Sequence, residues 1–329
     1  MAADTAYLWE PEGEGIRLLA YRGFDTLAVV PENIGGRPVR ALAPYLFSAH
    51  KNYSDPDHLE AHWYSCFGEK LSEEEAMELP EVKGDALREL RLPSALRQVG
   101  AYALYNCGNL RRLEFYASTA DWGTGVFTGC TAIEELSVHV DESGKSCLKE
   151  VLAELRQTLK VSCHGQEESR LIFPEFFEEA VENTPARILV TNTHGCGQKY
   201  RNCFVRTQLQ FQEYDGLFPH VKVQEPEKLV ADLALGRVMY PCCLSRRSRE
   251  AYMEYLGDHR RAAACAAVER EDTESLLWLL DHLSYEAEDL KAVIDAAGRR
   301  GNPAAVSLLM DKTRTAGEER ETRRRRFAL

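Results

Sequence analysis

The sequence has neither an excess of positive charge nor a long apolar run. It carries 40 basic residues against 52 acidic ones, a formal net charge of −12, which works against binding to nucleic acid or to an anionic membrane surface. No stretch approaches the roughly 18 consecutive apolar residues that a membrane-spanning helix needs. The first residues also lack a basic segment followed by an apolar run, so no secretory signal is expected. We therefore expect a cytoplasmic protein without nucleic-acid or membrane partners.

Cysteine is sparse as well, with 10 cysteines scattered among 329 residues. A hydrophobic content of 44% is enough to fill cores without cross-links, so we interpret the cysteines as reduced thiols. Sequence signatures of nucleotide binding, of the serine-nucleophile elbow and of zinc proteases are absent. The sequence thus predicts a protein that is not an enzyme and has no cofactor.

What the sequence does contain is an internal repeat of 23 residues. In each copy three apolar positions step i, i+3, i+5, so that the last two face the same way on a short strand. Because so small a unit cannot bury its apolar face alone, successive copies must stack into a solenoid whose strands line one face. The three clearest copies are Leu87, Leu90 and Leu92; Leu110, Leu113 and Phe115; and Ile133, Leu136 and Val138.

The repeat resembles the BspA-like (Treponema pallidum type) leucine-rich repeats. The resemblance is carried by residues 90–93, Leu-Arg-Leu-Pro, by residues 99–107, Val-Gly-Ala-Tyr-Ala-Leu-Tyr-Asn-Cys, and by an opening copy in which Leu42 takes the place of Val99. It covers about residues 15–140 and implies a leucine-rich-repeat fold that presents an extended concave surface to a macromolecular partner. Members of the family often occur at bacterial surfaces, which leaves a surface adhesin as one alternative function.

The remainder of the chain completes an α+β fold class. Apolar residues at helical spacing follow the last copy and predict a cap that closes the apolar core. Further on, an Ala-Ala pair at 266–267 recurs 30 residues later with similar surroundings, and this part resembles ankyrin-like helix-pair repeats. The expected domains are 1–162, a leucine-rich-repeat domain with an insertion at about 49–84 and a C-terminal cap; 163–225, a mixed connector; 226–315, a helical repeat domain; and 316–329, a charged tail.

The outward positions of the repeat strands form the candidate binding surface. Residues that flank an inward leucine point to the other side of the strand, where they make a face of mixed charge with Tyr116 at its centre. Tyrosine and arginine are common anchors for a protein or peptide partner, although a solvated sheet face with cross-strand ion pairs would produce the same pattern. The predicted partner-binding residues are Glu89, Arg91, Arg112, Glu114, Tyr116, Glu135 and His139.

The connector offers an alternative function, as a metal-binding protein or a thiol enzyme. Its histidine and cysteines are possible zinc ligands, which Cys242 and Cys243 could complete in space, or a Cys/His nucleophile pair. The C-x6-C spacing is not that of a zinc ribbon, however, and a glycine turn carrying ordinary thiols is the preferred interpretation. The residues concerned are His194, Cys196, Tyr200, Arg201 and Cys203.

The insertion contains a second set of possible metal ligands. His58, His62, Cys66 and Glu69 would share one face if this segment were helical. The acidic run at 73–75 that follows indicates a solvated helix or loop instead. The sequence therefore predicts no metal site here either.

Overall fold

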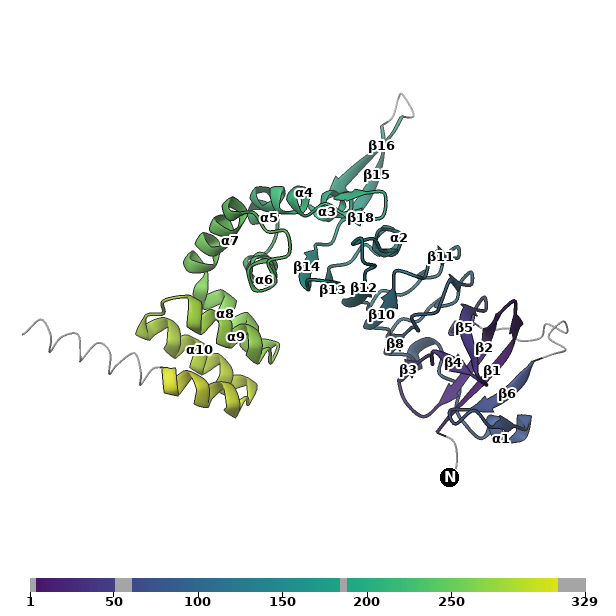
Figure 1. Cartoon of the computed structure of the whole chain (residues 1–329). Coiled ribbons are helices and arrows are strands. Elements are labelled where there is room, and N and C mark those ends of the chain that lie inside the picture. Colours follow the sequence, from purple (N-terminus) through teal and green to yellow (C-terminus); the bar gives the residue numbers. More distant parts are fainter. Residues whose placement is uncertain (1–3, 51–60, 184–187, 313–329) are drawn as a thin grey trace, which may run out of the picture. The chain divides into compact units, whose positions relative to one another are not determined.

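The computed structural model describes residues 4–50, 61–183 and 188–312 (Figure 1). It divides the chain into two compact units, Met1–Gln210 and Phe211–Leu329. The division falls inside the segment 163–225 that the sequence analysis treats as one connector. The expected tail at 316–329 lies outside the described residues.

The repeat copies of the first unit form a ladder of short strands. Neighbouring strands from β3 to β13 are parallel, and in the central three the residues 23 positions apart lie directly beside one another. Leu90, Leu113 and Leu136 are therefore adjacent, and each is at most 2% exposed. In sheet order the strands are β3 (Leu27–Val29), β8 (Glu89–Arg91), β10 (Arg112–Tyr116), β12 (Glu135–His139), β13 (Leu159–His164) and β14 (Ser169–Phe173).

The sheet runs past residue 162, where the sequence analysis places the end of this domain. Helix α2 (Leu148–Glu154) buries Leu148, Val151 and Leu152, as the helical spacing predicts. The strand that follows it, β13, adds another parallel strand to the ladder, and β14 then pairs antiparallel with β13. The antiparallel return, rather than α2 alone, ends the parallel series.

A second sheet contains the other half of each repeat. In it β5, β9 and β11 pair in parallel, and Leu42 lies beside Val99, as expected for an opening copy of the repeat. Phe115 of the ladder meets the ring of Trp122 edge-on, with centroids 5.5 Å apart, so apolar side chains fill the space between the sheets. The strands are β1 (Thr5–Glu12), β2 (Gly15–Gly23), β4 (Asn33–Ile34), β5 (Arg37–Leu42), β6 (His62–Ser65), β7 (Lys70–Leu71), β9 (Gln98–Val99) and β11 (Asp121–Trp122).

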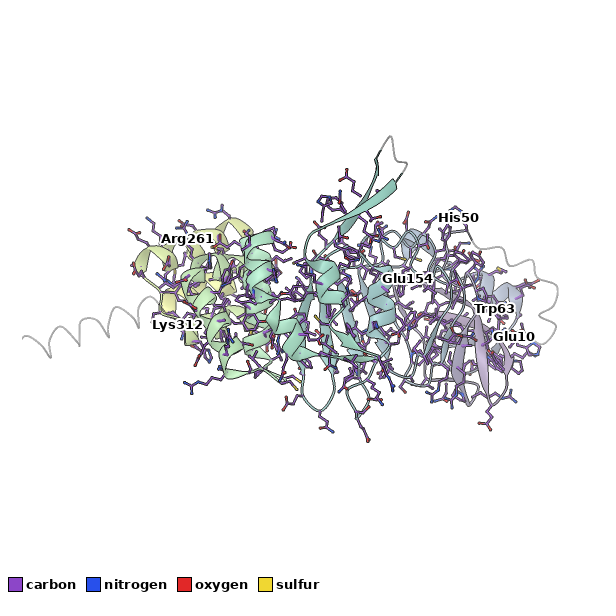
Figure 2. The ribbon with its side chains drawn as sticks, turned by 90° about the horizontal axis from the view of Figure 1, so that it is seen from above. Glu10, His50, Trp63, Glu154, Arg261 and Lys312 are labelled. Atoms are coloured by element: carbon purple, nitrogen blue, oxygen red, sulfur yellow. The ribbon has the colours of Figure 1, made fainter. Side chains whose placement is uncertain are left out.

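The insertion extends this second sheet. Strand β6 pairs antiparallel with β1, with Trp63 opposite Leu8 (Figure 2). Helix α1 (Glu73–Met77) follows and is capped by Ser72, which forms a capping box with Glu75. A short 3-10 helix, η1 (Gly84–Ala86), leads back to the ladder.

The end of the first unit is a hairpin followed by short elements. The hairpin strands β15 and β16 pair antiparallel with Phe177 opposite His194, and they project from the rest of the unit (Figure 1). The elements are β15 (Phe177–Asn183), β16 (Ile188–His194), α3 (Gly197–Arg201), β17 (Phe204–Val205) and β18 (Gln208–Leu209).

The second unit is helical and begins before residue 226, the expected start of the helical domain. Asp272 and Asn302 cap helices, because each side-chain oxygen accepts a hydrogen bond of 3.0 Å from a backbone N–H three residues on. Among the described residues, no helix combines the length and the apolar character needed to cross a membrane. The helices are α4 (Phe211–Gly216), α5 (Phe218–Gln224), α6 (Glu227–Met239), α7 (Arg246–Asp258), α8 (Arg260–Glu269), α9 (Thr273–His282) and α10 (Ala287–Arg300), followed by helical residues at 303–312.

Candidate partner-binding face

The strand register of the ladder arranges its outward side chains in three rows, which we call the ladder face. Each row crosses neighbouring strands at equivalent positions, so its members are spaced by the strand separation of about 4.8 Å. The first row is Glu89, Arg112, Glu135 and Lys160; the second is Arg91, Glu114, Ser137 and Ser162; the third is Tyr116, His139 and His164.

The first row is held together by ion pairs. Arg112 donates from Nη1 to Oε1 of Glu89 at 2.9 Å and from Nε to Oε2 of Glu135 at 2.8 Å. The carboxylate of Glu135, and then that of Glu89, raises the pKa of the Arg112 guanidinium. Because these side chains are about half exposed, each pair contributes at most about 1 kcal/mol to stability. For this row, therefore, the cross-strand ion pairs considered from the sequence are present.

The third row is a run of three neighbouring rings, which we call the ring stack. The ring of Tyr116 lies parallel to that of His139, with centroids 4.2 Å apart and planes within 10°. The ring of His139 in turn lies 4.9 Å from that of His164. The sequence placed Tyr116 at the centre of the face; the structure places it at one end of this row, with His139 in the middle, because β13 adds a further strand.

The second row fixes the orientation of the rings. Oε1 of Glu114 lies 2.9 Å from Nε2 of His139, and Oγ of Ser137 lies 2.9 Å from Nε2 of His164. Partial burial, together with the nearby carboxylates of Glu114 and Glu32, raises the pKa of the Tyr116 phenol. The polar partners fix the orientation of the two histidine rings, so less side-chain entropy is lost at these rings when a partner binds.

A loop contact borders the Tyr116 end of the row. The carboxylate of Glu32 accepts hydrogen bonds from the backbone N–H of Ser94 at 2.7 Å, from the Ser94 hydroxyl at 2.9 Å and from the N–H of Ala95 at 3.2 Å. The hydroxyl of Ser118 donates to the carbonyl of Ser94 at 2.6 Å. The turns beside Tyr116 are thus connected to one another, which gives the face a defined edge.

All seven residues predicted from the sequence lie on β8, β10 or β12 and face outward together. The sequence reasoning missed Lys160, Ser162 and His164, because it treated their segment as part of the cap. An alternating pattern of buried and outward residues in β13, with Leu159, Val161 and Cys163 buried, was the signal that could have found them.

The connector residues form a structural cluster instead of a shared site. His194 lies at the end of β16, where its ring stacks on Phe177 and its Nε2 is 3.3 Å from Oε2 of Glu179. Cys196, Tyr200 and Cys203 are buried around α3. In the described ranges of the chain, no three His, Cys, Asp or Glu residues gather as a metal would require.

Arg201 occupies the centre of this cluster and binds backbone carbonyls. Its guanidinium donates to the carbonyl oxygens of Leu155, Gln157, Pro174 and Gly197, and it is only 6% exposed. Burial lowers its pKa to about 10. Four of the five N–H donors of this guanidinium bind backbone carbonyls, so Arg201 joins α2, β14 and α3.

The possible metal ligands considered in the insertion do not share a helical face. His62 is part of the strand β6, and Cys66 lies in the turn after it, because this segment pairs with the edge of β1. His58 lies outside the described residues. The helical spacing assumed for these ligands was therefore wrong.

The comparisons with known proteins concern the ladder. The family model of the BspA type leucine rich repeat region matches residues 83–159, in six copies. Residues 83–159 are a BspA-type leucine-rich repeat region. Among solved structures, a T. pallidum leucine rich repeat protein matches at 22% identity over 43% of this chain and 72% of that one, with a TM-score of 0.18, too low to compare the two shapes. No curated protein matches this chain.

The BspA-type repeats account for most of the ladder face. The matched segment contains β8, β10 and β12 with all seven predicted residues, and it ends at Leu159, the first residue of β13. The family therefore explains the stacking of the strands. His164 lies beyond the matched segment.

Proposed function

We propose that this chain is a non-catalytic interaction protein that binds a protein or peptide partner through the ladder face of its BspA-type repeats. The observation that supports the proposal most is the ring stack of Tyr116, His139 and His164. The row offers a half-buried strip of aromatic rings beside rows of charged and polar side chains, and tyrosine is one of the residue types enriched in binding hot spots.

The rows beside the stack set the character of the partner. Arg112 is bracketed by two carboxylates, so an incoming acidic group would have to compete with Glu89 and Glu135. Arg91 in turn lies 3.6 Å from the carboxylate of Glu114, whereas Lys160 is the other cation of the first row and the one offered to such a group. We infer that the partner contacts the rings with an apolar or aromatic side chain and uses charge mainly to set its register.

We make three further proposals, about the shape of the ladder, the helical unit and the location of the protein. The first is that the ladder is a solenoid whose concave side is the ladder face. The helices of the second unit act as ankyrin-like helix pairs, an idea supported by the caps at Asp272 and Asn302 and by the buried Ala266–Ala267 and Ala296–Ala297 pairs. The protein works in the cytoplasm, in keeping with its acidic composition, and recovery from a surface fraction of its own cells would contradict this last proposal.

The test compares crosslinked partners of three versions of the tagged full-length protein in extracts of its own cells. The first is the wild type, and the second carries Tyr116→Ala and His139→Ala. The control carries Phe24→Ala, which removes an exposed ring (70% exposed) that is not part of the three rows. Circular dichroism and thermal melting establish that all three are folded.

We expect one defined partner to be captured by the wild type and by Phe24→Ala and to be lost from the double variant. Truncating two stacked rings at the centre of an interface costs about 2 kcal/mol or more, which is at least a tenfold loss of affinity. A partner that all three versions capture equally would show that binding occurs on another surface and would overturn the assignment of the ladder face.

A further inference from the structure

Two adjacent thiols lie at the surface of the helical unit, in the turn between α6 and α7. The Sγ atoms of Cys242 and Cys243 are 3.9 Å apart. Cys243 is exposed and Cys242 is partly buried. Cys243 has a φ of +51°, a left-handed conformation that a residue with a side chain adopts only at a cost of about 1 kcal/mol. The turn that imposes it is closed by a hydrogen bond of 3.0 Å from the N–H of Leu244 to the carbonyl of Pro241.

The two thiols lie in a turn that leads directly into a helix. They lie just before the N-terminus of α7, a helix of 13 residues whose N-cap, Ser245, accepts a hydrogen bond from the N–H of Ser248. The positive end of a helix dipole stabilises a nearby anion. Arg246 and Arg247 occupy the first turn and add positive charge. The thiolate is the nucleophile in thiol chemistry, and the exposed Cys243 is the thiol of the pair that a small disulfide reaches first.

The turn is also connected to the interior of the unit. The backbone carbonyl of Cys242 accepts a hydrogen bond of 3.0 Å from Nη2 of Arg237. Arg237 itself is fully buried and binds both carboxylate oxygens of Asp215, which also accepts a hydrogen bond from the hydroxyl of Tyr252. A change in the orientation of the Cys242 carbonyl would therefore break its hydrogen bond with Arg237 and alter the buried Arg237–Asp215 ion pair.

We propose that Cys242 and Cys243 form a dithiol modification site, which reacts with a small disulfide of the glutathione class and closes to a disulfide between the two neighbours. The exposed Cys243 thiolate attacks one sulfur of the small disulfide, forms a mixed disulfide and releases one small thiol. The Cys242 thiolate then attacks Sγ of Cys243, forms the intramolecular bond and expels the second small thiol. Two protein thiols are oxidised, and one small disulfide is reduced to two thiols.

Closure of this bond strains the turn. Neighbouring Cα atoms are about 3.8 Å apart, whereas the Cα atoms of ordinary disulfides are at least about 4.4 Å apart. The peptide between the cysteines has to rotate to accommodate the bond, and its carbonyl, which is that of Cys242, then leaves Arg237. Strained and exposed disulfides are easily reduced again, so the modification is reversible.

The experiment treats the full chain with glutathione disulfide, alkylates the remaining thiols and maps tryptic peptides by mass spectrometry. Trypsin cleaves after Arg237 and Arg246, so the peptide 238–246 contains these two cysteines and no other. We expect this peptide to lose two hydrogen atoms and to escape alkylation, and dithiothreitol to reverse the change. Cys66, an exposed cysteine with no adjacent thiol, serves as the internal control and should retain glutathione instead.

Two variants, Cys242→Ser and Cys243→Ser, each remove one of the two thiols. In Cys242→Ser the second step is blocked, so we expect a stable glutathione adduct on Cys243. If the wild-type peptide carries glutathione as stably as this variant, or if both of its thiols are alkylated after treatment, the dithiol site is overturned.

The connection to Arg237 is tested by amide hydrogen exchange, which should become severalfold faster in α6 of the oxidised wild type but not in equally treated Cys243→Ser. Unchanged exchange in a fully oxidised wild type would overturn the coupling.

Discussion

The guanidinium of Arg237 binds the carboxylate of Asp215 through two parallel hydrogen bonds, of 2.8 and 3.0 Å, in the interior of the helical unit. The two side chains are 0% and 2% exposed. The hydroxyl of Tyr252 donates to the same carboxylate at 2.9 Å, and burial together with that carboxylate raises the pKa of the tyrosine. Three helices, α4, α6 and α7, are thereby joined at one point by groups that depend on each other.

Removing one member of this buried pair should cost much more than removing both. We expect Asp215→Ala to lower the free energy of unfolding of this unit by about 3 to 5 kcal/mol, because it leaves the charge of Arg237 buried without a partner. The double variant Asp215→Leu, Arg237→Met should recover a large part of that loss. Urea unfolding followed by the fluorescence of Trp278, in a background with Trp9, Trp63 and Trp122 replaced by Phe, measures both.

A surface pair gives the matched control for that comparison. Arg246 and Glu250 are paired on α7 but are 92% and 64% exposed, so Arg246→Met should change the free energy of unfolding by at most about 0.5 kcal/mol. A loss in Asp215→Ala as small as this one would show that the buried pair does not stabilise the unit.

The packing of the ladder is tested at Leu113. This side chain is 1% exposed between Leu90 and Leu136, and Leu113→Asp would place an unpaired carboxylate in the core. We expect the cooperative melt of the first unit, followed by near-ultraviolet circular dichroism, to disappear. Arg111→Asp, two residues away and exposed, should leave the melt within about 1 kcal/mol of the wild type. A normal melt for Leu113→Asp would mean that the repeat has been placed in the wrong register.

Arg201 should stabilise its unit through hydrogen bonds rather than through charge. We expect Arg201→Met to cost about 3 kcal/mol or more, because it leaves four buried carbonyl groups without their donor. Arg201→Lys keeps the charge but has no planar fork of donors, so it should recover little of the loss. Chemical unfolding of the three proteins separates the two explanations: full recovery by Lys would show that charge alone matters.

The ladder itself could be predicted from the sequence because its signal is periodic. Leu90, Leu113 and Leu136 recur at a fixed spacing, and that spacing also determines which outward residues share a row. The third row was only partly predicted, since His139 and His164 are 25 residues apart and α2 replaces the usual connection between their strands. A search for repeats spaced by 23 residues cannot find β13, because the connection through α2 gives this strand a different spacing.

The buried polar groups could not be predicted for a different reason. Asp215, Arg237 and Tyr252 come from three separate helices, and nothing in their local sequence distinguishes them from exposed charged residues. Arg201 similarly binds carbonyls of distant segments, which carry no side-chain signature at all. Such networks depend on tertiary packing, whereas the repeat depends only on local pattern.

The buried thiol of Cys163 provides a prediction that depends on pH. Cys163 lies on β13 with 7% of its surface exposed, and burial raises its pKa to about 12 from an ordinary value of 9.0. The folded protein therefore keeps the proton over a range in which the unfolded chain loses it. The stability that follows from the protonated thiol is fully present below about pH 9 and is lost as the pH rises from there towards 12.

We expect this one group to reduce the free energy of unfolding by about 1.4 kcal/mol between about pH 8 and about pH 10, because each unit of difference in pKa corresponds to that amount. Cys163→Ala has a lower absolute stability from the lost packing, but its unfolding free energy should fall less steeply over the same range. Urea unfolding at several pH values, followed by tryptophan fluorescence in a Trp278→Phe background that reports the first unit, measures the two slopes. Buried tyrosines such as Tyr7 and Tyr21, whose pKa values burial also raises, contribute equally to both proteins and cancel in the comparison. Equal slopes for the two proteins would show that Cys163 reaches solvent or ionises normally in the folded state.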